Sequence, residues 1–469
     1  KLWRRSNVAT DMEFYELRYS GWGGKFLRGF RAIYLGVIFN VMAMSGVTLA
    51  AIKIGEIMLG LTPLETILYA GTITVIFSTV GGFRGVVYTD FILFFAAMVG
   101  SIGAAYYLVN LPEVGGITNL ISSTPSEMLS ITPSFSDPNV YIPLLIVPLA
   151  VQWWSSWYPG AEPGGGGYIA QRMLAAKDEN NAIGATFFFN VMHYALRPWP
   201  WIIVALASLI IFPDLDSIQA AFPNISEDKL GQDLAYPAML TLLPSGLLGL
   251  VVASLVAAYM STISTHLNWG SSYIVNDFYK QQIKKDASEK ELVNIGRVST
   301  ILLFILSSIF ALLLTNALQL FDVILMFGAG TGLNFILRWF WWRINAWSEI
   351  AAMFVSGFVS IALNFSSLGT YLFSDSGVMD SYYKFPSVVL FTTIIWLIVT
   401  YLTNPDTESN SRKAISILSL SVKSMCLDFI PLRGGCLVND FSRSITVTFQ
   451  PSRKALSASG RPIPPAPPT

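Results

Sequence analysis

The sequence predicts an all-α, polytopic membrane protein: a bundle of helices that cross a lipid bilayer many times. Three numbers and one pattern support this prediction. Hydrophobic residues make up 53% of the 469 residues and charged residues only 12%, whereas a soluble domain carries about a quarter charged residues. Mean hydropathy is +0.55, and long apolar runs recur along the chain. Helices suit such runs because they satisfy every backbone polar group within one segment.

The apolar runs are separated by polar connections, and most are long enough to cross about 30 Å of hydrocarbon as a helix. They are Ala32–Ile52, Thr66–Phe83, Phe91–Pro112, Val140–Tyr158, Ala182–Phe212, Gly246–Val275, Val298–Phe321, Val323–Leu337, Ile350–Phe373 and Phe385–Thr403. Arg197 is the only Asp, Glu, Lys or Arg inside any of them. We therefore expect residues 1–404 to form one transmembrane domain of about ten spans.

Prolines and one acidic residue predict where this pattern is interrupted. Pro244 marks a break between a short surface helix and the span that follows it. Pro143 and Pro148 predict a discontinuous helix, and residues 198–200 (Pro-Trp-Pro) predict a second bend. We expect a tight turn near Asp322, between the seventh and eighth runs.

Loop charges predict the orientation of the bundle. Residues 1–31 carry seven Lys or Arg, and residues 277–297 carry five, whereas residues 113–139 carry none. By the positive-inside rule the N-terminal residues are cytoplasmic, in a multi-pass protein of the cell (inner or plasma) membrane. Residues 405–469 end in a Pro-rich run and predict a flexible cytoplasmic tail.

Several function classes are excluded by what the sequence lacks. Lys+Arg and Asp+Glu both number 29, which gives no basic excess for nucleic acid. No HExxH, GxSxG or Walker pattern occurs, and Cys426 and Cys436 form no metal or disulfide pattern, so we do not expect an enzyme. The run PGAEPGGGG, residues 159–167, is either a flexible connection or a hinge beside a moving helix.

Hydroxyl side chains gather on one face of the sixth run. Ala258, Ser261, Thr262 and Thr265 fall at i, i+3, i+4 and i+7, and Ser264 lies beside that face. Hydroxyl and carbonyl oxygens are hard ligands suited to a small alkali cation in a dehydrated pocket. The alternative is that these hydroxyls bond back to the i−4 carbonyl or join helices together.

Other polar or aromatic residues at the spans are also candidates. Asp90 stands in the run YTDFILFF, where it is either a functional acid or a solvated cap. His193 lies within an apolar run and either faces a polar cavity or is a structural histidine. Trp157 and Tyr158 follow the predicted broken helix, where they either line a substrate gate or belong to an interfacial belt.

Together these segments resemble the sodium:solute symporter family, which includes sodium/proline, sodium/sialic acid and sodium/galactose symporters. The resemblance covers roughly Thr10 to Glu408. Its carriers are DMEFYELRY, GGFRGVVYTDFI, GYIAQRMLAAKDENNA, LPSGLLGLVVASLVAAYMSTISTHLN followed by NDFYK, and RWFWWRINAWSEIAA. The resemblance implies a five-plus-five inverted-repeat core that works by alternating access.

The same resemblance implies site residues. It places a sodium ion at Ala258, Ser261 and Thr262. A second sodium site, present in some members, falls on Asp90, Ser264 and Thr265. His193 stands where sugar-transporting members have a lysine, and Phe321 stands where they have a glutamine. These two differences argue against assigning the sugar specificity of those members to this chain.

The family pattern also places DMEFYELRY after the second core helix, so we expect an N-terminally truncated chain that lacks the first core helix. The leading hypothesis is sodium-coupled secondary active symport of a small organic solute. The alternatives are a transporter-like membrane sensor or scaffold, or a non-functional symporter fragment. Sugars, amino acids, sialic acid and carboxylates all remain open as solutes.

Overall fold

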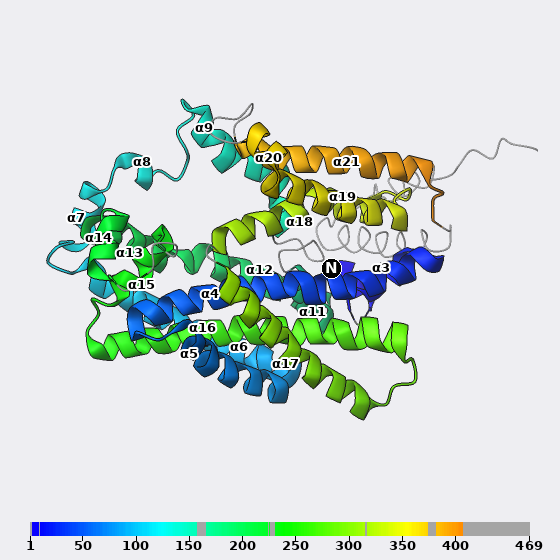
Figure 1. Ribbon diagram of the computed structural model, residues 1–469, viewed down its shortest axis with the longest axis horizontal. Helices are drawn as coiled ribbons and strands as arrows, with labels where there is room; N and C mark the ends of the chain where they lie inside the picture. The colour runs from blue at the N-terminus through cyan, green and yellow to red at the C-terminus, as the bar shows by residue number, and fades with distance from the viewer. Residues whose placement is uncertain are drawn as a thin grey trace, which may run out of the picture.

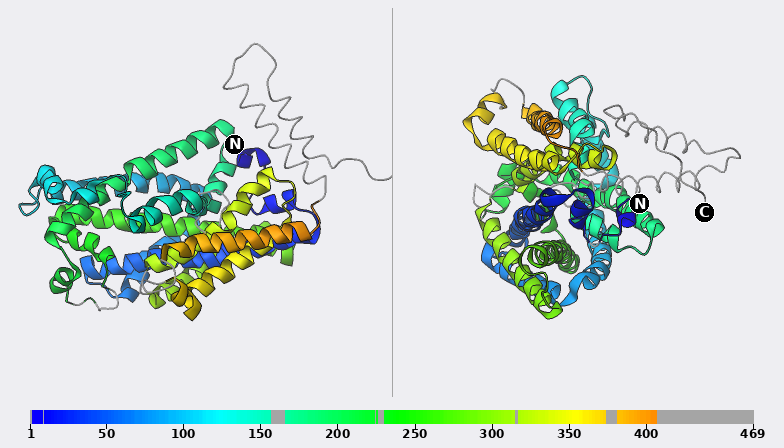
Figure 2. Two further views of the ribbon diagram at one scale, coloured as in Figure 1. Left: turned by 90° about the horizontal axis from the view of Figure 1, so that it is seen from above. Right: turned by 90° about the vertical axis from the view of Figure 1, so that its right-hand side faces the viewer.

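The computed structural model describes residues 2–8, 10–156, 166–223, 225, 230–314, 317–373 and 381–406, and every regular element within them is a helix. The long helices lie side by side along the long axis of the molecule, as Figures 1 and 2 show. Trp157, Tyr158, most of the Gly-rich run and residues 407–469 lie outside the described residues. The predicted tail is therefore still a prediction.

Helices follow one another closely along the chain. The first part contains α1 (Leu2–Ser6), α2 (Glu13–Arg18), α3 (Gly21–Ile33), η1 (Tyr34–Phe39), α4 (Asn40–Leu59), α5 (Pro63–Thr66), η2 (Ile67–Gly71) and α6 (Thr72–Val109). The middle part contains α7 (Gly116–Ser123), α8 (Ser126–Leu129), α9 (Pro138–Tyr141), η3 (Ile142–Ile146), η4 (Pro148–Gln152), α10 (Trp153–Ser156), α11 (Gly166–Ala175), α12 (Glu179–Asn190), η5 (Val191–Leu196) and α13 (Pro198–Ile211). The last part contains α14 (Leu215–Ala221), η7 (Gln232–Leu234), α15 (Ala235–Leu240), α16 (Ser245–Ser272), η8 (Tyr273–Ile283), α17 (Glu289–Leu313), α18 (Ala317–Phe340), α19 (Ala346–Phe365), α20 (Ser367–Leu372), η9 (Ser381–Tyr383) and α21 (Lys384–Leu402).

The described residues contain several helices of membrane-spanning length. Seven helical stretches are long and apolar enough to cross a bilayer: Gly21–Leu59, Gly85–Val109, Glu179–Ile211, Ser245–Ile283, Glu289–Leu313, Ala346–Phe365 and Lys384–Leu402. Two shorter apolar helices are Pro138–Gln152 and Ile324–Phe340. These stretches support a multi-pass membrane protein, and the predicted total of about ten spans stays a prediction.

Of the predicted interruptions of the helices, the break at Pro244 is confirmed and the turn near Asp322 is wrong. The break at Pro244 is confirmed, because α15 ends at Leu240 and α16 begins at Ser245, directly after the proline. The turn expected near Asp322 is wrong, since the chain runs as helix through that position in α18. The preceding helix, α17, ends earlier, at Leu313, and the backbone of Leu314 is extended. The good helix formers Ala, Leu and Gln at residues 317–320 then start α18 before the acid is reached.

The structure has π-helical segments at or next to the prolines where the sequence predicted bends. Residues Ile142–Ile146 and Pro148–Gln152 form π-helical segments, and so do Val191–Leu196 before the Pro-Trp-Pro run. A proline lacks the N–H that an α-helix needs, so a local i→i−5 pattern keeps the remaining groups bonded. The Arg197 N–H, for example, donates to the Met192 carbonyl at 3.0 Å. The helices therefore change pitch at these prolines.

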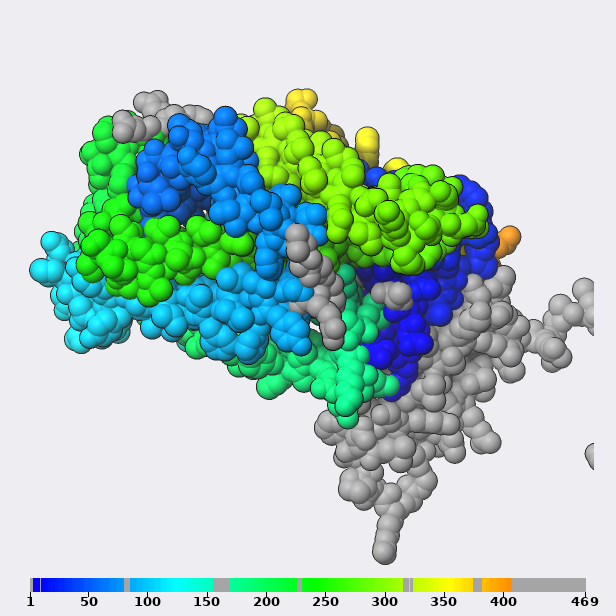
Figure 3. Space-filling model, turned by 90° about the horizontal axis from the view of Figure 1, so that it is seen from below, coloured from blue at the N-terminus to red at the C-terminus, as the bar shows by residue number. Residues whose placement is uncertain are grey.

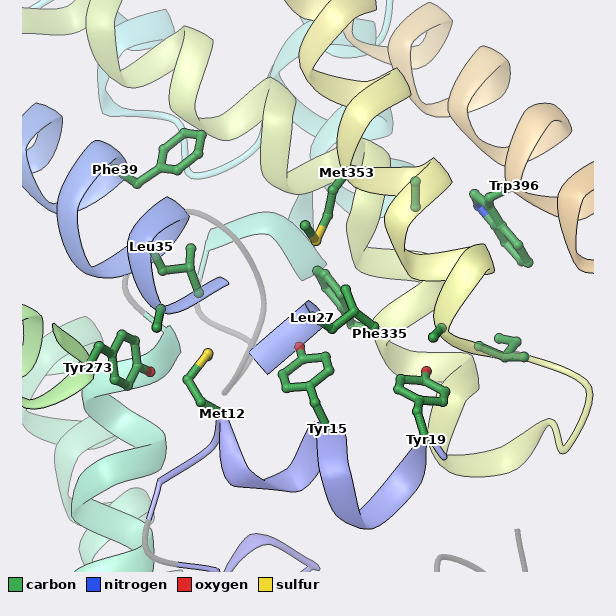
Figure 4. Close-up of a cluster of buried hydrophobic side chains, with 14 of the residues drawn as sticks. Met12, Tyr15, Tyr19, Leu27, Leu35, Phe39, Tyr273, Phe335, Met353 and Trp396 are labelled. Atoms are coloured by element: carbon green, nitrogen blue, oxygen red, sulfur yellow. The ribbon is translucent and has the colours of Figure 1, made fainter. Parts of the chain in front are cut away.

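The main core lies where the N-terminal segment packs against the ends of later helices. Figure 4 shows its side chains converging from α2, α3, α18, α19 and α21. Met12, Tyr15, Leu27 and Phe335 are almost fully buried there. The described residues from Thr10 to Ser20 are therefore an integral part of the bundle.

That core also encloses charge. Arg338 and Glu349 are both 0% exposed and pair at 3.4 Å. Arg338 also donates to the Tyr15 hydroxyl at 2.5 Å, and the Tyr19 hydroxyl donates to Glu349. Arg18 donates to the carbonyl of Ile344 at 2.9 Å. We call these five residues the buried charge cluster; together they join α2 to the facing ends of α18 and α19.

Three further hydrogen bonds join the N-terminal segment to η8, the helical segment that follows α16. Asp277 accepts from Arg28 at 2.8 Å and from the Thr10 hydroxyl at 3.1 Å. The buried Tyr273 hydroxyl donates to Asp11. Burial raises the pKa of the Asp11 carboxyl above its ordinary value, while the hydrogen bond from Tyr273 acts in the opposite direction.

Candidate functional site

A cavity of about 360 Å³ opens between the helices that carry most of the predicted site residues. The helices around it, α6, α11, α12 and α16, pack against one another in the bundle (Figure 1). The described residues that line it are Asp90, Ile169, Arg172, Met173, Ala185, Thr186, Phe189, His193, Arg197, Ser261, Thr262, Thr265 and His266. Its size suits a small organic molecule.

Asp90 is the centre of the polar contacts in this cavity. Its Oδ1 accepts from the Ser261 hydroxyl at 2.5 Å, and its Oδ2 accepts from the Thr265 hydroxyl at 3.2 Å. Arg172 approaches the same Oδ2 at 2.7 Å and the Thr265 oxygen at 3.2 Å. We call Asp90, Arg172, Ser261 and Thr265 the Asp90 cluster. It brings together residues from three helices that are far apart in sequence.

The α16 hydroxyls make two kinds of contact. Ser261 and Thr265 donate to Asp90 of α6 and so link the two helices, and the predicted ion-binding role of this face stays a prediction. Thr262 donates back to the Ala258 carbonyl at 3.0 Å, and Ser264 donates to the Ser261 carbonyl at 3.2 Å. Ser264 is therefore beside the Asp90 cluster without touching the carboxylate.

Ala258 and Thr262 face a second hollow, a groove of about 370 Å³ between α4, the α5–α6 region and α16. Its walls are almost wholly apolar. Thr262 lines both this groove and the Asp90 cavity, so it stands on the wall between them. The three residues predicted for the first sodium ion thus lie on adjoining surfaces of one helix.

His193 faces the Asp90 cavity, which is one of the two positions that the sequence allowed. Its ring stacks on Phe189 with centroids 5.0 Å apart and meets Tyr194 edge-on at 4.7 Å. Phe189, His193 and Arg197 recur every fourth residue along α12, η5 and the start of α13, which explains why all three reach the cavity.

Two polar residues of the cavity wall, Arg172 and His266, were given no role from the sequence. Arg172 stands in GYIAQRMLAAKDENNA, a segment that carried the family resemblance but no role. His266 is buried, with its Nδ1 2.6 Å from the Asn40 Oδ1, while the Asn40 amide donates to the His266 carbonyl at 2.8 Å. A polar residue inside an otherwise apolar run, as Asn40 is, was the available signal.

The chain is similar to several characterised transporters. The model of the sodium:solute symporter family matches residues 1–356. A sodium/glucose cotransporter of Vibrio parahaemolyticus is 24% identical over 427 residues, which cover 88% of this chain and 75% of that protein. Sodium/myo-inositol cotransporter 2 of Rattus norvegicus is 28% identical over 386 residues, which cover 74% of this chain and 55% of that protein. The chain thus spans about half the length of the rat relative.

The fold of the chain is similar to that of a solved transporter structure. A Na⁺-coupled sialic acid symporter, in a substrate-bound outward-open state, matches with a TM-score of 0.64 at 19% identity. The match covers 87% of this chain and 80% of that one. This likeness confirms the predicted fold class, an all-α polytopic bundle of the transporter type.

Proposed function

This chain belongs to the sodium:solute symporter family, and from that membership we propose that it carries a small organic solute across the membrane together with sodium. The named relatives are sodium-coupled carriers of glucose and of myo-inositol. The family consists of transporters, so the expectation that the chain is not an enzyme agrees with its membership.

The observation that carries this proposal is the Asp90 cluster. The Asp90 carboxylate of α6 and two hydroxyls of α16, which are 171 and 175 residues away in sequence, meet beside a cavity of solute size. Such oxygens are the hard ligands that a dehydrated alkali cation needs. We propose Asp90, Ser264 and Thr265 as a second sodium site, with Ala258, Ser261 and Thr262 as the first.

Arg172 sets a condition on the second site. Its guanidinium now holds the Asp90 oxygen that a sodium ion would need, at 2.7 Å. Two cations at that distance repel each other, so sodium binds at Asp90 only when Arg172 withdraws. Both side chains are partly exposed, 31% for Arg172 and 23% for Asp90, which leaves the arginine room to move.

Coupling follows from charge movement across the membrane. At about 100 mV each entering charge supplies about 2.3 kcal/mol, and about 1.4 kcal/mol corresponds to a tenfold accumulation. One ion therefore supports more than one decade of accumulation before its own gradient is counted. The mechanism requires that sodium bind the outward-open state more tightly than the inward-open state.

The loop charges support one orientation. With residues 1–31 and 277–297 strongly basic, we propose that the N-terminal residues and the C-terminal tail face the cytoplasm. We also propose Trp157, Tyr158 and His193 as residues of the substrate path, of which His193 lines the cavity.

Uptake into proteoliposomes tests the proposal. The full chain is reconstituted, and solute accumulation is measured with an inward gradient of sodium or, as the control, of choline. Ser261→Ala and Thr262→Ala should each raise the sodium concentration needed for half-maximal uptake. Accumulation that persists unchanged in choline would exclude sodium coupling.

A further inference from the structure

We propose that Gly167 is a positioning residue for Arg172. Because Gly167 has no side chain, α11 lies close enough to α16 for Arg172 to reach Asp90, and this contact sets the sodium requirement of transport. The inference rests on the proposed function, in which Arg172 and sodium compete for Asp90. Gly167 is the last residue of the Gly-rich run at residues 159–167.

The space around Gly167 is closed. Gly167 is buried near the start of α11, which lies against α16 (Figure 1). A Cβ atom built at Gly167 would lie 2.6 Å from the Trp269 Cζ2 and 2.6 Å from the Tyr273 Oη, whereas ordinary contacts between carbon atoms are about 3.5–4.0 Å long. The φ of Gly167 lies outside the left-handed region. The close approach, and not the backbone conformation, therefore requires a glycine here.

The two rings that face Gly167 are held in place. Trp269 and Tyr273 belong to the main core (Figure 4 labels Tyr273), and each is only 2% exposed. The Tyr273 hydroxyl donates to Asp11, and side chains packed at core density have little room to turn. In contrast, α11 has only ten residues, while α16 and η8 form one span of 39 residues. A side chain at residue 167 would therefore displace α11, by about 1 Å.

The contacts of Gly167 and Arg172 lie on one face of the α16–η8 span. Thr265, Trp269 and Tyr273 follow one another at intervals of four residues, so their side chains share a face. Gly167 meets that face at Trp269 and Tyr273, and Arg172 meets it at the Thr265 hydroxyl, 3.2 Å away. Helix rises by about 7.5 Å from Gly167 to Arg172 and by about 6 Å from Trp269 back to Thr265. Displacement of α11 at Gly167 therefore also draws Arg172 away from α16.

A displacement of this size is enough to separate Arg172 from Asp90. The Arg172 Nη2 lies 2.7 Å from the Asp90 Oδ2, and a further 1 Å would exceed the length of about 3.2 Å at which an N–H···O bond ends. Asp90 would then be open to sodium although no charge had been removed from the cavity. Gly167 thus favours the arginine-bound form of the site, which raises the sodium concentration that transport needs.

Gly167→Ala tests the inference by uptake into proteoliposomes. Half-maximal uptake should need less sodium than in the parent, by up to about fivefold, while the maximal rate is kept. Gly167→Ala combined with Arg172→Gln should need no less sodium than Arg172→Gln alone, because the arginine through which Gly167 acts is then absent. A merely structural glycine would not depend on Arg172 in this way.

Gly184→Ala is the matched control. Gly184 also lies within a helix, α12, but a Cβ atom built there would meet nothing within 4 Å. Its sodium requirement should therefore equal that of the parent. An equal fall in both variants would assign the effect to the better helix propensity of alanine and would overturn the inference.

Chemical modification of Arg172 gives a readout that needs no sodium. The purified full chain is treated with phenylglyoxal in detergent without sodium, and the rate at Arg172 is read by mass spectrometry of its peptide. The reagent attacks the uncharged guanidine, which a carboxylate partner disfavours. Arg172 should therefore react faster in Gly167→Ala than in the parent, as it should in Asp90→Asn. Arg343, which lies over the Tyr401 ring and does not line the cavity, is the internal reference.

Four results with Gly167→Ala would overturn the inference: a sodium requirement that is unchanged or raised, an effect that adds to that of Arg172→Gln, a parental reaction rate at Arg172, or a protein that does not fold. The last counts because the inference requires a shift of α11 and not a loss of structure. Failure of the proposed function looks different. Uptake that is the same in choline, together with faster modification of Arg172, would keep the positioning role and reject sodium coupling.

Discussion

The buried charge cluster and the Asp90 cluster are built from the same residue types, an arginine, a carboxylate and hydroxyls, but their surroundings differ. Arg338 and Glu349 are fully enclosed and have tyrosine partners. Arg172 and Asp90 remain partly exposed beside a cavity. An enclosed pair is expensive to separate, whereas a pair at a wet surface exchanges partners at little cost. The first cluster is therefore suited to hold helices together, and the second to exchange an arginine for an ion.

Breaking the buried charge cluster should have the largest effect on stability. Glu349→Leu leaves Arg338 buried without its carboxylate, which should destabilise the protein by about 3–5 kcal/mol. The measurement is the thermal midpoint in detergent. The double variant Arg338→Leu with Glu349→Leu removes both charges and should recover part of the loss. A single variant as stable as the parent would contradict the contrast between the two clusters.

Asp90→Asn tests the other side of the comparison. Because the Arg172–Asp90 pair is partly exposed, its loss should lower stability by less than about 1 kcal/mol. Sodium activation of uptake should change far more, because the site loses its only carboxylate: the sodium concentration for half-maximal uptake should rise about tenfold or more. A drop in thermal midpoint as large as that of Glu349→Leu would show that Asp90 is structural.

Arg172→Gln should act in the opposite direction and by less. Without its guanidinium Asp90 is available to sodium, so half-maximal uptake should need up to about fivefold less sodium, the equivalent of about 1 kcal/mol. Arg5→Gln, which removes an arginine paired with Glu179 outside the cavity, is the control. If the sodium requirement rose instead, Arg172 would position Asp90 rather than compete with the ion.

The smallest expected effect concerns Asp11, beside the buried charge cluster. Burial raises the pKa of its carboxyl above 3.8, so the folded protein keeps this proton to a higher pH than the unfolded chain. Its contribution to stability is present below the unfolded pKa and is lost as pH rises through the folded pKa. The thermal midpoint of the parent relative to Asp11→Asn should therefore fall as pH rises from about 4. An opposite slope would contradict burial as the cause.

The sequence predicted the bundle better than it predicted the site. Apolar length alone indicates helices in lipid, and Pro244 has no N–H to continue one, so both predictions depend on local chemistry. The partnership of Arg172 with Asp90 joins residues 82 positions apart, and no local pattern contains it. The enclosed Arg338 is a similar case, because its burial depends on the packing of α2 against α18 and α19.

The π-helical segment Val191–Leu196, just before Arg197, gives its helix a property that a regular helix lacks. A π turn stores one surplus residue. If that surplus moved along the helix, the intervening residues would each advance by one position, about 1.5 Å along the axis and 100° around it. Such a displacement breaks only a few backbone hydrogen bonds at a time. Few unpaired N–H or C=O groups would then face the hydrocarbon during the movement. The face that includes His193 would then turn by about 100° around the helix axis while the helix keeps its hydrogen bonds.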